Sequence, residues 1–254
     1  MMHLQNIKKN EIKSEDHFNK EAETYSNKYK NNNGTGHSFR SRLSLAVKML
    51  ENFDKGNLLD IGGGTGIYLS KLKDRIDSYT LIDISSEMIK IARQVDAGGL
   101  QYDCRVGSIY NLPFEEENFD IILAIGLFEY LDDPNFALQN INKVAKPGCQ
   151  ILISFPNIKS PMRRLSNWIY SLFKKPSPFA SKMFSISEVK EMVSDLNFKI
   201  VDVKGYNAQL IPFPLIWKIP TISYYFAVIL EPLLNKIGTM WGTGFIIKLK
   251  KINA

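Results

Sequence analysis

The chain has 254 residues, of which 44% are hydrophobic and 23% charged, and its formal net charge is +6. This length and ordinary globular composition suit one large α/β domain with a solvated, mildly basic surface. Neither Cys104 nor Cys149 stands in a metal-ligand spacing, so we expect no metal and a reduced, cytoplasmic protein. The polar first residues lack the apolar run of a signal peptide.

The N-terminal part predicts an arm followed by two helices. Residues 1–16 are polar, and we expect a flexible arm there. Residues 17–30 carry apolar side chains at helical spacing (i, i+4, i+7, i+11), namely Phe18, Ala22, Tyr25 and Tyr29. This stripe either packs on the core or covers a ligand. A loop at 31–36 and a second helix at 39–53 are expected next.

From residue 57 onward, apolar strands alternate with amphipathic helices, which is typical of a parallel sheet with right-handed crossovers. The expected strands are 57–61, 79–83, 102–106, 119–125, 149–155, 198–203 and 244–249. The expected helices are 66–74, 86–95, 134–145 and 186–196. The sequence therefore predicts an α/β domain at 55–254, preceded by an N-terminal arm and helical cap at 1–54.

A glycine-rich turn follows the first expected strand, with Gly62, Gly64 and Gly66 in alternate positions. Glycines can adopt positive φ and let a ligand lie against bare backbone. The N–H groups at the start of the next helix favour a polar or negatively charged group. Because Ile67 occupies the place of the third glycine in the dinucleotide pattern, an NAD-linked oxidoreductase is disfavoured.

Five blocks resemble, in order, the motifs of the class I S-adenosylmethionine (SAM)-dependent methyltransferases. They are Asp60–Gly66, Tyr79–Asp83, Gly107–Phe114, Phe119–Ala124 and Lys146–Ser154, and together they cover about residues 55–157. The spacing of Phe18, Ala22 and Tyr25 is similar to that of the ubiquinone/menaquinone-biosynthesis type. The resemblance implies a Rossmann-like, doubly wound, seven-stranded sheet with an antiparallel seventh strand. It also implies SAM as cofactor.

The resemblance also implies a set of cofactor-binding residues. Asp83, at the end of the second strand, would accept hydrogen bonds from both ribose hydroxyls. Ser108 stands where the family commonly has an aspartate that accepts a hydrogen bond from the adenine amino group. Its hydroxyl can still accept one, but without the charge. The full expected set is Tyr25, Asp60, Gly62, Gly64, Asp83, Ile84, Met88, Ser108, Ile109 and Ile125.

The reaction implied is SN2 transfer of a methyl group to oxygen, nitrogen or carbon of an acceptor held in line. An oxygen or carbon acid also needs a base. Glu129, shortly after the fourth strand, is the first candidate for substrate contact or base, and Tyr130 is the second. His37, expected in a loop near the cofactor mouth, is the third, although a lone loop histidine is usually just exposed.

Two apolar stretches, 158–176 and 206–243, fall outside this minimal core. The first predicts a basic amphipathic helix that contains Trp168. The first stretch suits a lid over the substrate or a helix packed on the rim of the sheet, and the second suits a hydrophobic lid or a wall of the substrate site. A dimer surface and a peripheral membrane contact, through 159–175 and 208–230, are further alternatives. The prolines in the second stretch argue against a membrane span.

The function expected is methylation of a small, hydrophobic acceptor. The alternative is a non-enzymatic SAM-fold module that binds a protein partner or a membrane surface. Nucleic acid is disfavoured as a substrate, because the Asn/Asp-Pro-Pro-Tyr/Phe motif of base-methylating relatives is missing after the fourth strand. The oligomeric state stays open.

Overall fold

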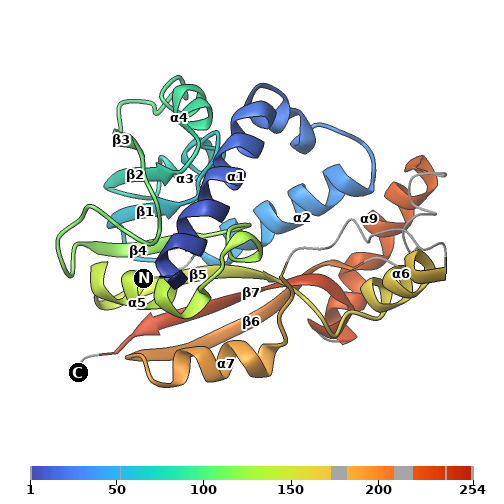
Figure 1. Cartoon of the computed structure of the whole chain (residues 1–254). Helices are drawn as coiled ribbons and strands as arrows, with labels where there is room; N and C mark the ends of the chain where they lie inside the picture. The colour runs from blue at the N-terminus through green and yellow to red at the C-terminus, as the bar shows by residue number, and fades with distance from the viewer. Residues whose placement is uncertain (1, 52, 173–181, 209–219, 238, 253–254) are drawn as a thin grey trace.

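The computed structural model describes residues 2–51, 53–172, 182–208, 220–237 and 239–252 (Figure 1). Its centre is a seven-stranded sheet with the order β3-β2-β1-β4-β5-β7-β6. The strands are β1 (Asn57–Ile61), β2 (Ser78–Asp83), β3 (Gln101–Val106), β4 (Phe119–Ala124), β5 (Ala145–Pro156), β6 (Phe198–Ala208) and β7 (Gly242–Lys251). β7 runs antiparallel to both of its neighbours, β5 and β6, and the other neighbouring strands pair in parallel. The predicted seven-stranded fold is confirmed.

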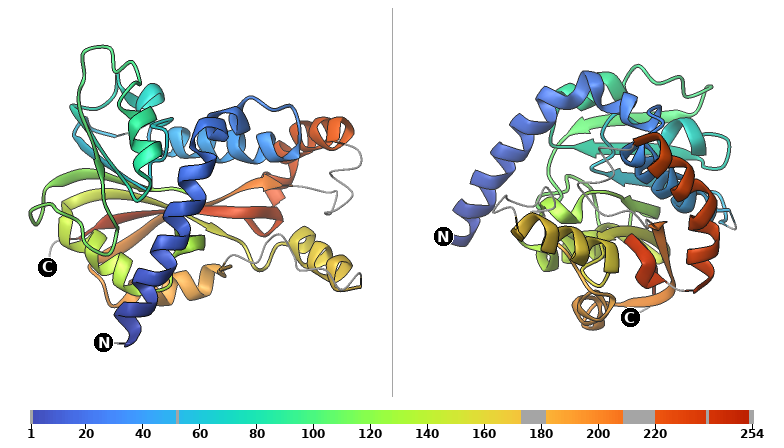
Figure 2. Two further views of the ribbon diagram at one scale, coloured as in Figure 1. Left: turned by 45° about the horizontal axis from the view of Figure 1, so that its top comes forward. Right: turned by 90° about the vertical axis from the view of Figure 1, so that its right-hand side faces the viewer.

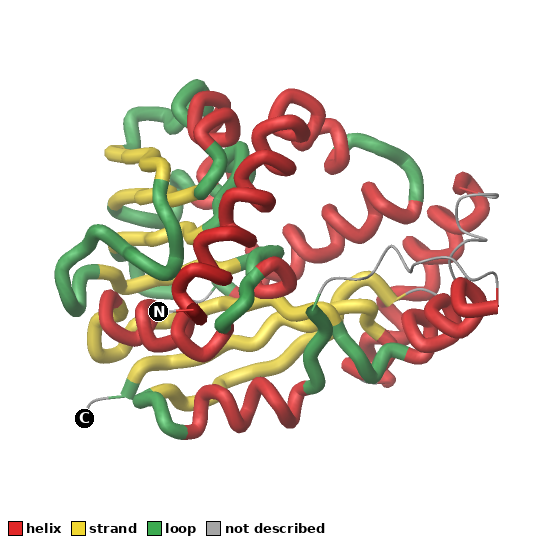
Figure 3. Tube along the Cα trace, viewed as in Figure 1, coloured by secondary structure: helices red, strands yellow, loops and turns green. Residues whose placement is uncertain are grey.

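Helices cover both faces of this sheet (Figure 3). On one face lie α2 (Gly34–Met49), α3 (Leu69–Leu72) and α4 (Ser86–Ala92), whose buried side chains pack with Leu58 of β1. On the other face lie α5 (Pro134–Val144) and α7 (Ile186–Ser194), which pack with Leu59 and Ile61. Because strand residues alternate between faces, β1 is buried on both sides.

The strand order reverses between β1 and β4, which pair with each other in parallel. In an open α/β sheet, ligands bind beyond the carboxyl ends of the strands at such a switch point. The glycine turn directly follows β1, and the short helix η2 (Phe128–Tyr130) follows β4. The topology therefore brings the predicted cofactor and catalytic residues to one edge of the sheet.

The N-terminal segment corrects one expectation. Instead of a flexible arm, residues 2–25 form a single helix, α1 (Met2–Tyr25), followed by the 3-10 turn η1 (Ser26–Tyr29). No glycine or proline interrupts this stretch, and Ile7 and Ala22 are almost fully buried on its inner side. The helix packs against α4 and crosses over the central strands (Figures 1 and 2).

Several helix boundaries also differ from expectation. α2 begins at Gly34, because the side chain of Asn33 caps it by accepting a hydrogen bond from the N–H of Gly36 at 2.9 Å. His37 therefore lies in this helix and is buried, not exposed in a loop. The helix expected at 66–74 is reduced to α3, because turns occupy most of that stretch.

The two apolar stretches each contribute a helix at the same end of the molecule, on the right in Figure 1. These are α6 (Pro161–Leu172) after β5 and α9 (Pro220–Ile237) after β6, with the short η3 (Thr239–Trp241) leading into β7. Residues 173–176, 209–219 and 238 of these stretches lie outside the described residues. Among the helices that the structure describes, none combines the length and apolarity that crossing a bilayer requires.

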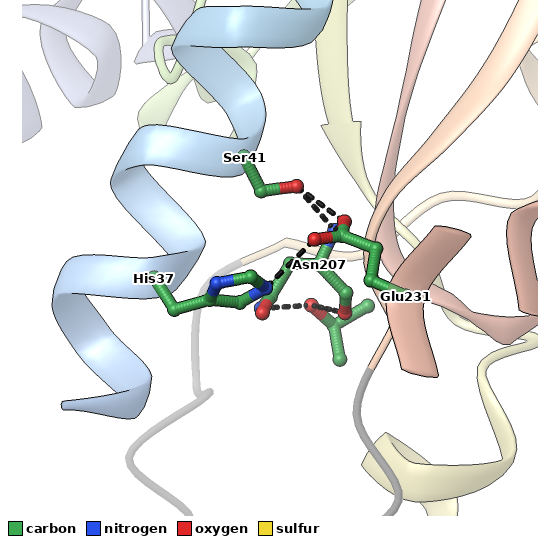
Figure 4. Close-up of polar contacts among 5 residues, drawn as sticks. His37, Ser41, Asn207 and Glu231 are labelled. Carbon is green, nitrogen blue, oxygen red and sulfur yellow. Dashed lines mark hydrogen bonds and ion pairs between the residues drawn. The ribbon is translucent and has the colours of Figure 1, made fainter. Parts of the chain in front are cut away.

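A buried polar network fastens α9 to the rest of the domain (Figure 4). His37 Nε2 lies 2.7 Å from one carboxylate oxygen of Glu231, and the hydroxyl of Ser41 donates to the other. The backbone N–H of Asn207, at the end of β6, donates to the hydroxyl oxygen of Ser41 and to the carboxylate of Glu231. Burial opposes ionisation of Glu231, but the contacts with His37 and Ser41 outweigh it and hold its pKa below the ordinary value. This network gives His37 a structural role.

Candidate active site

The glycine turn after β1 depends on backbone conformations that side chains disfavour. Gly62, Gly64 and Gly66 have φ values of 69°, 55° and 76°. Gly63 has a different constraint, which the sequence motif did not reveal. A Cβ at this position would lie 2.7 Å from both Asp60 Oδ2 and a side-chain carbon of Leu81. The turn is therefore packed against the strands beneath it.

The carboxylate of Asp83 connects the glycine turn to the end of β2. One oxygen accepts the N–H of Gly64 at 2.9 Å, and the other accepts the N–H of Ser85 at 2.8 Å. Burial raises the pKa of Asp83, although these hydrogen bonds oppose the rise. Each carboxylate oxygen has a further lone pair, so the group can also accept hydrogen bonds from a ligand.

A cleft runs along this edge of the sheet and holds about 760 Å³ of space between its walls, open solvent included. It is lined by Tyr25, Gly62, Gly64, Asp83, Ile84, Met88, Ser108 and Ile109, all of which were expected to bind the cofactor. The structure thus brings most of the predicted set together around one space.

Asp60 and Ile125 do not line this cleft. Asp60 is 1% exposed, lies beneath the glycine turn and accepts a hydrogen bond from the hydroxyl of Tyr79. Burial raises the pKa of Asp60 to about 7, opposed by the Tyr79 hydrogen bond and reinforced by the charge of Asp83. Ile125 packs in the hydrophobic core at the end of β4. Both residues support the site from below.

Of the candidate catalytic residues, only Tyr130 lines the cleft. Glu129 Oε1 lies 3.8 Å from Arg42 Nη1, and its other oxygen is buried with no hydrogen-bond partner among the described residues. Burial raises the pKa of Glu129, and the nearby Arg42 opposes the rise. Arg42 also lies against Gly126, where a Cβ would be 2.6 Å from its Nη1. His37 is held away from the cleft by Glu231.

One wall of the cleft comes from α1, which sequence reasoning only partly foresaw. The lining residues from this helix are Glu11, Ser14, Phe18 and Tyr25. Their spacing of three, four and seven residues places them on one face of the helix. Phe18 packs edge-on against Tyr130 with ring centroids 5.1 Å apart. The expected apolar stripe begins at Phe18, so the two polar members of this face were missed.

The charges around the cleft indicate which kind of ligand fits. Its lining contains three acidic residues, Glu11, Asp83 and Asp132, and no Lys, Arg or His among the residues that the structure describes. Such a cleft repels a pyrophosphate but accommodates a nucleoside with positively charged groups. SAM carries a sulfonium, an ammonium group and one carboxylate, so its net charge is positive, and it has no phosphate; these residues fit that cofactor.

The sheet order, the glycine turn after β1 and the carboxylate at the end of β2 are those of an α/β domain of the class I SAM-dependent type. A family model described as "Methyltransferase domain" matches residues 28–203. The chain belongs to this methyltransferase domain family, and the cofactor of its class is SAM.

Curated relatives match more than half of the chain. A demethylmenaquinone methyltransferase of Staphylococcus epidermidis is 30% identical over 158 residues, which cover 59% of this chain and 64% of that protein. A ubiquinone biosynthesis O-methyltransferase of Xanthomonas euvesicatoria is 25% identical over 154 residues, covering 58% and 64%. An uncharacterised protein of Methanocaldococcus jannaschii is 31% identical over 147 residues, covering 57% and 65%. The matched part thus spans less than two thirds of each relative.

Solved structures show the same fold. The magnesium protoporphyrin IX methyltransferase of Synechocystis, solved with bound S-adenosylhomocysteine (SAH), superposes with a TM-score of 0.62 at 14% identity. The superposition covers 84% of each chain. A SAM-dependent methyltransferase of Thermotoga maritima superposes with a TM-score of 0.60 at 20% identity, covering 92% of this chain and 97% of that one. At these identities the likeness concerns the fold alone.

The raised pKa of Asp60 predicts a pH-dependent cost to stability. Between pH about 4, where an unfolded aspartate ionises, and pH about 7, the folded protein holds a proton that the unfolded chain has lost, so stability falls as pH rises. Asp60→Asn keeps an acceptor for Tyr79 and removes the titration. We expect this variant to be more stable than wild type at pH ~8, by on the order of 2–4 kcal/mol, with a much smaller gain at pH ~4.

Urea unfolding at the two pH values measures this difference. The exposed Asp74, changed to Asn, serves as the control and should show no such pH-dependent gain. A gain from Asp60→Asn that is the same at both pH values would contradict the explanation.

Proposed function

We propose that this protein transfers the methyl group of SAM to a small, hydrophobic acceptor. The observation that carries the proposal is the composition of the cleft where it extends past the glycine turn. The walls there are aromatic and aliphatic, formed by Phe18, Tyr25, Leu127, Tyr130 and Leu131. Such walls favour a flat or branched apolar group over a sugar or a charged metabolite.

The named relatives agree with this acceptor class. Two of them act, by name, in ubiquinone biosynthesis and on demethylmenaquinone. Both names refer to quinones, which are apolar ring systems. For this chain we propose the broader class only, a ring-containing apolar acceptor, and leave the methylated atom to experiment.

We propose the following division of labour for the cofactor. Asp83 would hold the ribose, because its carboxylate is fixed by two backbone N–H groups and still has free lone pairs. Gly62 and Gly64 would let the methionine end lie against bare backbone, with Tyr25 opposite Gly64. SAM supplies an activated methyl group on its sulfonium. The protein's task is then to hold the acceptor in line and exclude water.

Tyr130 and Glu129, the two candidates for handling the proton that the acceptor loses, differ in chemistry. Burial raises the pKa of Tyr130 to about 12, so its hydroxyl stays protonated at neutral pH and can orient an acceptor as a donor. The Glu129 side chain is 13% exposed, burial raises its pKa, and one carboxylate oxygen has no hydrogen-bond partner among the described residues, which makes it a stronger base than an ordinary carboxylate. We propose Tyr130, which lines the cleft, for acceptor contact. We propose Glu129, which precedes it in η2 but does not line the cleft, as the base acting through one intervening water.

The function is tested with methyl-labelled SAM and a matched acceptor panel. We expect label transfer to alkyl-substituted phenols and hydroquinones, and none to the same rings bearing a sulfonate. The variant Asp83→Ala should need more than about tenfold more SAM for the same rate, because a charge-assisted contact to the ribose is lost. The control variant Asp74→Ala, at an exposed position, should need no more SAM than wild type. Absence of SAH binding in a calorimetric titration of the wild type would refute the proposal.

Glu129→Gln and Tyr130→Phe should change the kinetics in different ways. If Glu129 is the base, activity rises with pH through its raised pKa, and Glu129→Gln loses this acid limb with a kcat lower by about 10²-fold or more. Tyr130→Phe should chiefly raise KM for the acceptor by several-fold. Steady-state profiles from pH 5 to 9 separate the two effects. An unchanged acid limb in Glu129→Gln would exclude it as the base.

A second proposal concerns the outer faces of α6 and α9. On α9 the exposed side chains follow one helical stripe, Ile222, Tyr225, Phe226, Ile229 and Leu233, between 51% and 65% exposed. On α6, Trp168 and Leu172 are 58% and 61% exposed. So many exposed apolar side chains on neighbouring segments of one end of a protein mark an interaction surface. We call these seven residues the apolar face.

The charges around the apolar face favour an anionic lipid surface. The exposed Lys159 and Arg164 flank it, and the sequence of α6 contains no acidic residue. The one acidic residue of α9, Glu231, is turned inward to His37 (Figure 4). Apolar side chains beside cations and without exposed carboxylates suit the interface of an anionic bilayer. An apolar acceptor dissolved in that bilayer would then lie near the edge of the sheet that holds the cleft.

We expect the protein to cosediment with phosphatidylglycerol-containing vesicles more strongly than with pure phosphatidylcholine vesicles. Changing Trp168 and Ile229 together to Ser should weaken this binding by roughly tenfold or more, because apolar area no longer enters the interface. The control is Val201→Ser, which removes an equally exposed apolar side chain from β6. Undiminished binding of the double variant would contradict the proposal. Vesicle binding without methyl transfer would favour the non-enzymatic alternative.

A further inference from the structure

The end of the cleft away from Gly126 is an apolar slot with a polar rim. Met88 and Ile109 are 1% and 5% exposed and form its sides together with Ile84. Because the strand order is β3-β2-β1-β4, Asp83 at the end of β2 lies between the glycine turn after β1 and Ile109 after β3, and these residues line one cleft. With the ribose at Asp83, the slot is where the base of an adenosyl cofactor would lie. The polar groups on its rim then decide which base is accepted.

Two of these rim groups come from distant parts of the chain. The hydroxyl of Ser108 donates a hydrogen bond to the carboxylate of Glu11, which α1 brings to the cleft. The same hydroxyl accepts the backbone N–H of Tyr110 at 3.0 Å. Its one hydrogen is therefore used, and the carboxylate has none to give. Glu11 and Ser108 can therefore only accept hydrogen bonds from a ligand, and the carboxylate of Glu11 is negatively charged.

The position of Glu11 is fixed by contacts on both sides of it along α1. Asn10 donates its side-chain amide to Asp132 at 2.9 Å. Asn19 accepts hydrogen bonds from the hydroxyl of Ser85 at 2.7 Å and from the N–H of Glu87 at 3.3 Å. These contacts join α1 to both sides of the cleft. Glu11 therefore reaches Ser108 as part of an anchored helix.

We propose that Glu11 reads the exocyclic amino group of the adenine ring and supplies the negative charge that Ser108 lacks. An acceptor-only carboxylate pairs with an amino group and repels a carbonyl oxygen at the same ring position. The carboxylate that recognises the base thus comes from the N-terminal helix, while β3 contributes only a hydroxyl. This inference rests on the proposed use of a SAM-type cofactor.

The test is calorimetric titration with SAH and with its 6-oxo analogue, in which hypoxanthine replaces adenine. We expect wild type to prefer SAH by about tenfold or more, since hydrogen bonds to charged groups are the stronger ones. Glu11→Gln should lower the affinity for SAH by a similar factor. It should not weaken binding of the 6-oxo analogue, because the glutamine amide can donate to its carbonyl. The preference for the amino group should therefore shrink or reverse.

Two further variants control for effects on folding and on α1. Asp16→Asn removes an exposed negative charge from the same helix and should leave both affinities unchanged. Adding Ser108→Asp to Glu11→Gln returns a carboxylate to the rim from β3 and should restore the preference for SAH. That rescue would not occur if Glu11 merely held α1 in place.

The titrations of Glu11→Gln test the role of Glu11, and the titrations of wild type test the proposed function. Glu11→Gln weakening both ligands equally, or neither, would show that Glu11 does not read the base. If wild-type protein binds neither ligand, the proposed function itself fails, and the inference fails with it.

Discussion

The carboxylate of Asp83 is the contact on which the rest of the site depends. It holds the N–H of Gly64 with one oxygen and the N–H of Ser85 with the other, so it joins the turn after β1 to the start of α4. A buried carboxylate without such donors would carry a large desolvation cost. The glycine turn supplies one of these donors only because Gly62 and Gly64 adopt positive φ. The two carboxylate oxygens of Asp83 thus stabilise the turn and are also the atoms available to a ligand.

The sheet and most of the cleft could be predicted because their signals are local in sequence. Strand periodicity, the glycine spacing and the acid at the end of β2 each lie within a few residues, and the structure brings these residues together as expected. The constraint on Gly63 could not be predicted in full in this way, because half of it comes from Leu81 on β2, beside the nearby Asp60. Contacts between residues far apart in the chain produce no periodic pattern in the sequence.

The first part of α1, up to residue 16, was missed for a related reason. Its inner face holds Ile7, Glu11, Ser14 and Phe18, and it faces a cleft for a polar ligand, not the hydrophobic core. Hydrophobic periodicity detects only faces that pack on the core, so the polar half of this face resembled a solvated arm. His37 shows the converse case. Its partner Glu231 is far along the chain, and without that partner a lone histidine is indistinguishable from a surface residue.

The electrostatics of the site also differ from what its glycine turn suggests. Glycine turns often bind phosphate because a helix N-terminus follows them directly. Here α3 is only four residues long and starts at Leu69, after two further residues in the turn, so its dipole gives an anion little support. Asp83 beside the turn, together with Glu11 and Asp132 in the lining, makes the cleft negative instead. The same loop geometry that elsewhere holds a pyrophosphate is thus suited in this chain to a ligand with positive charge.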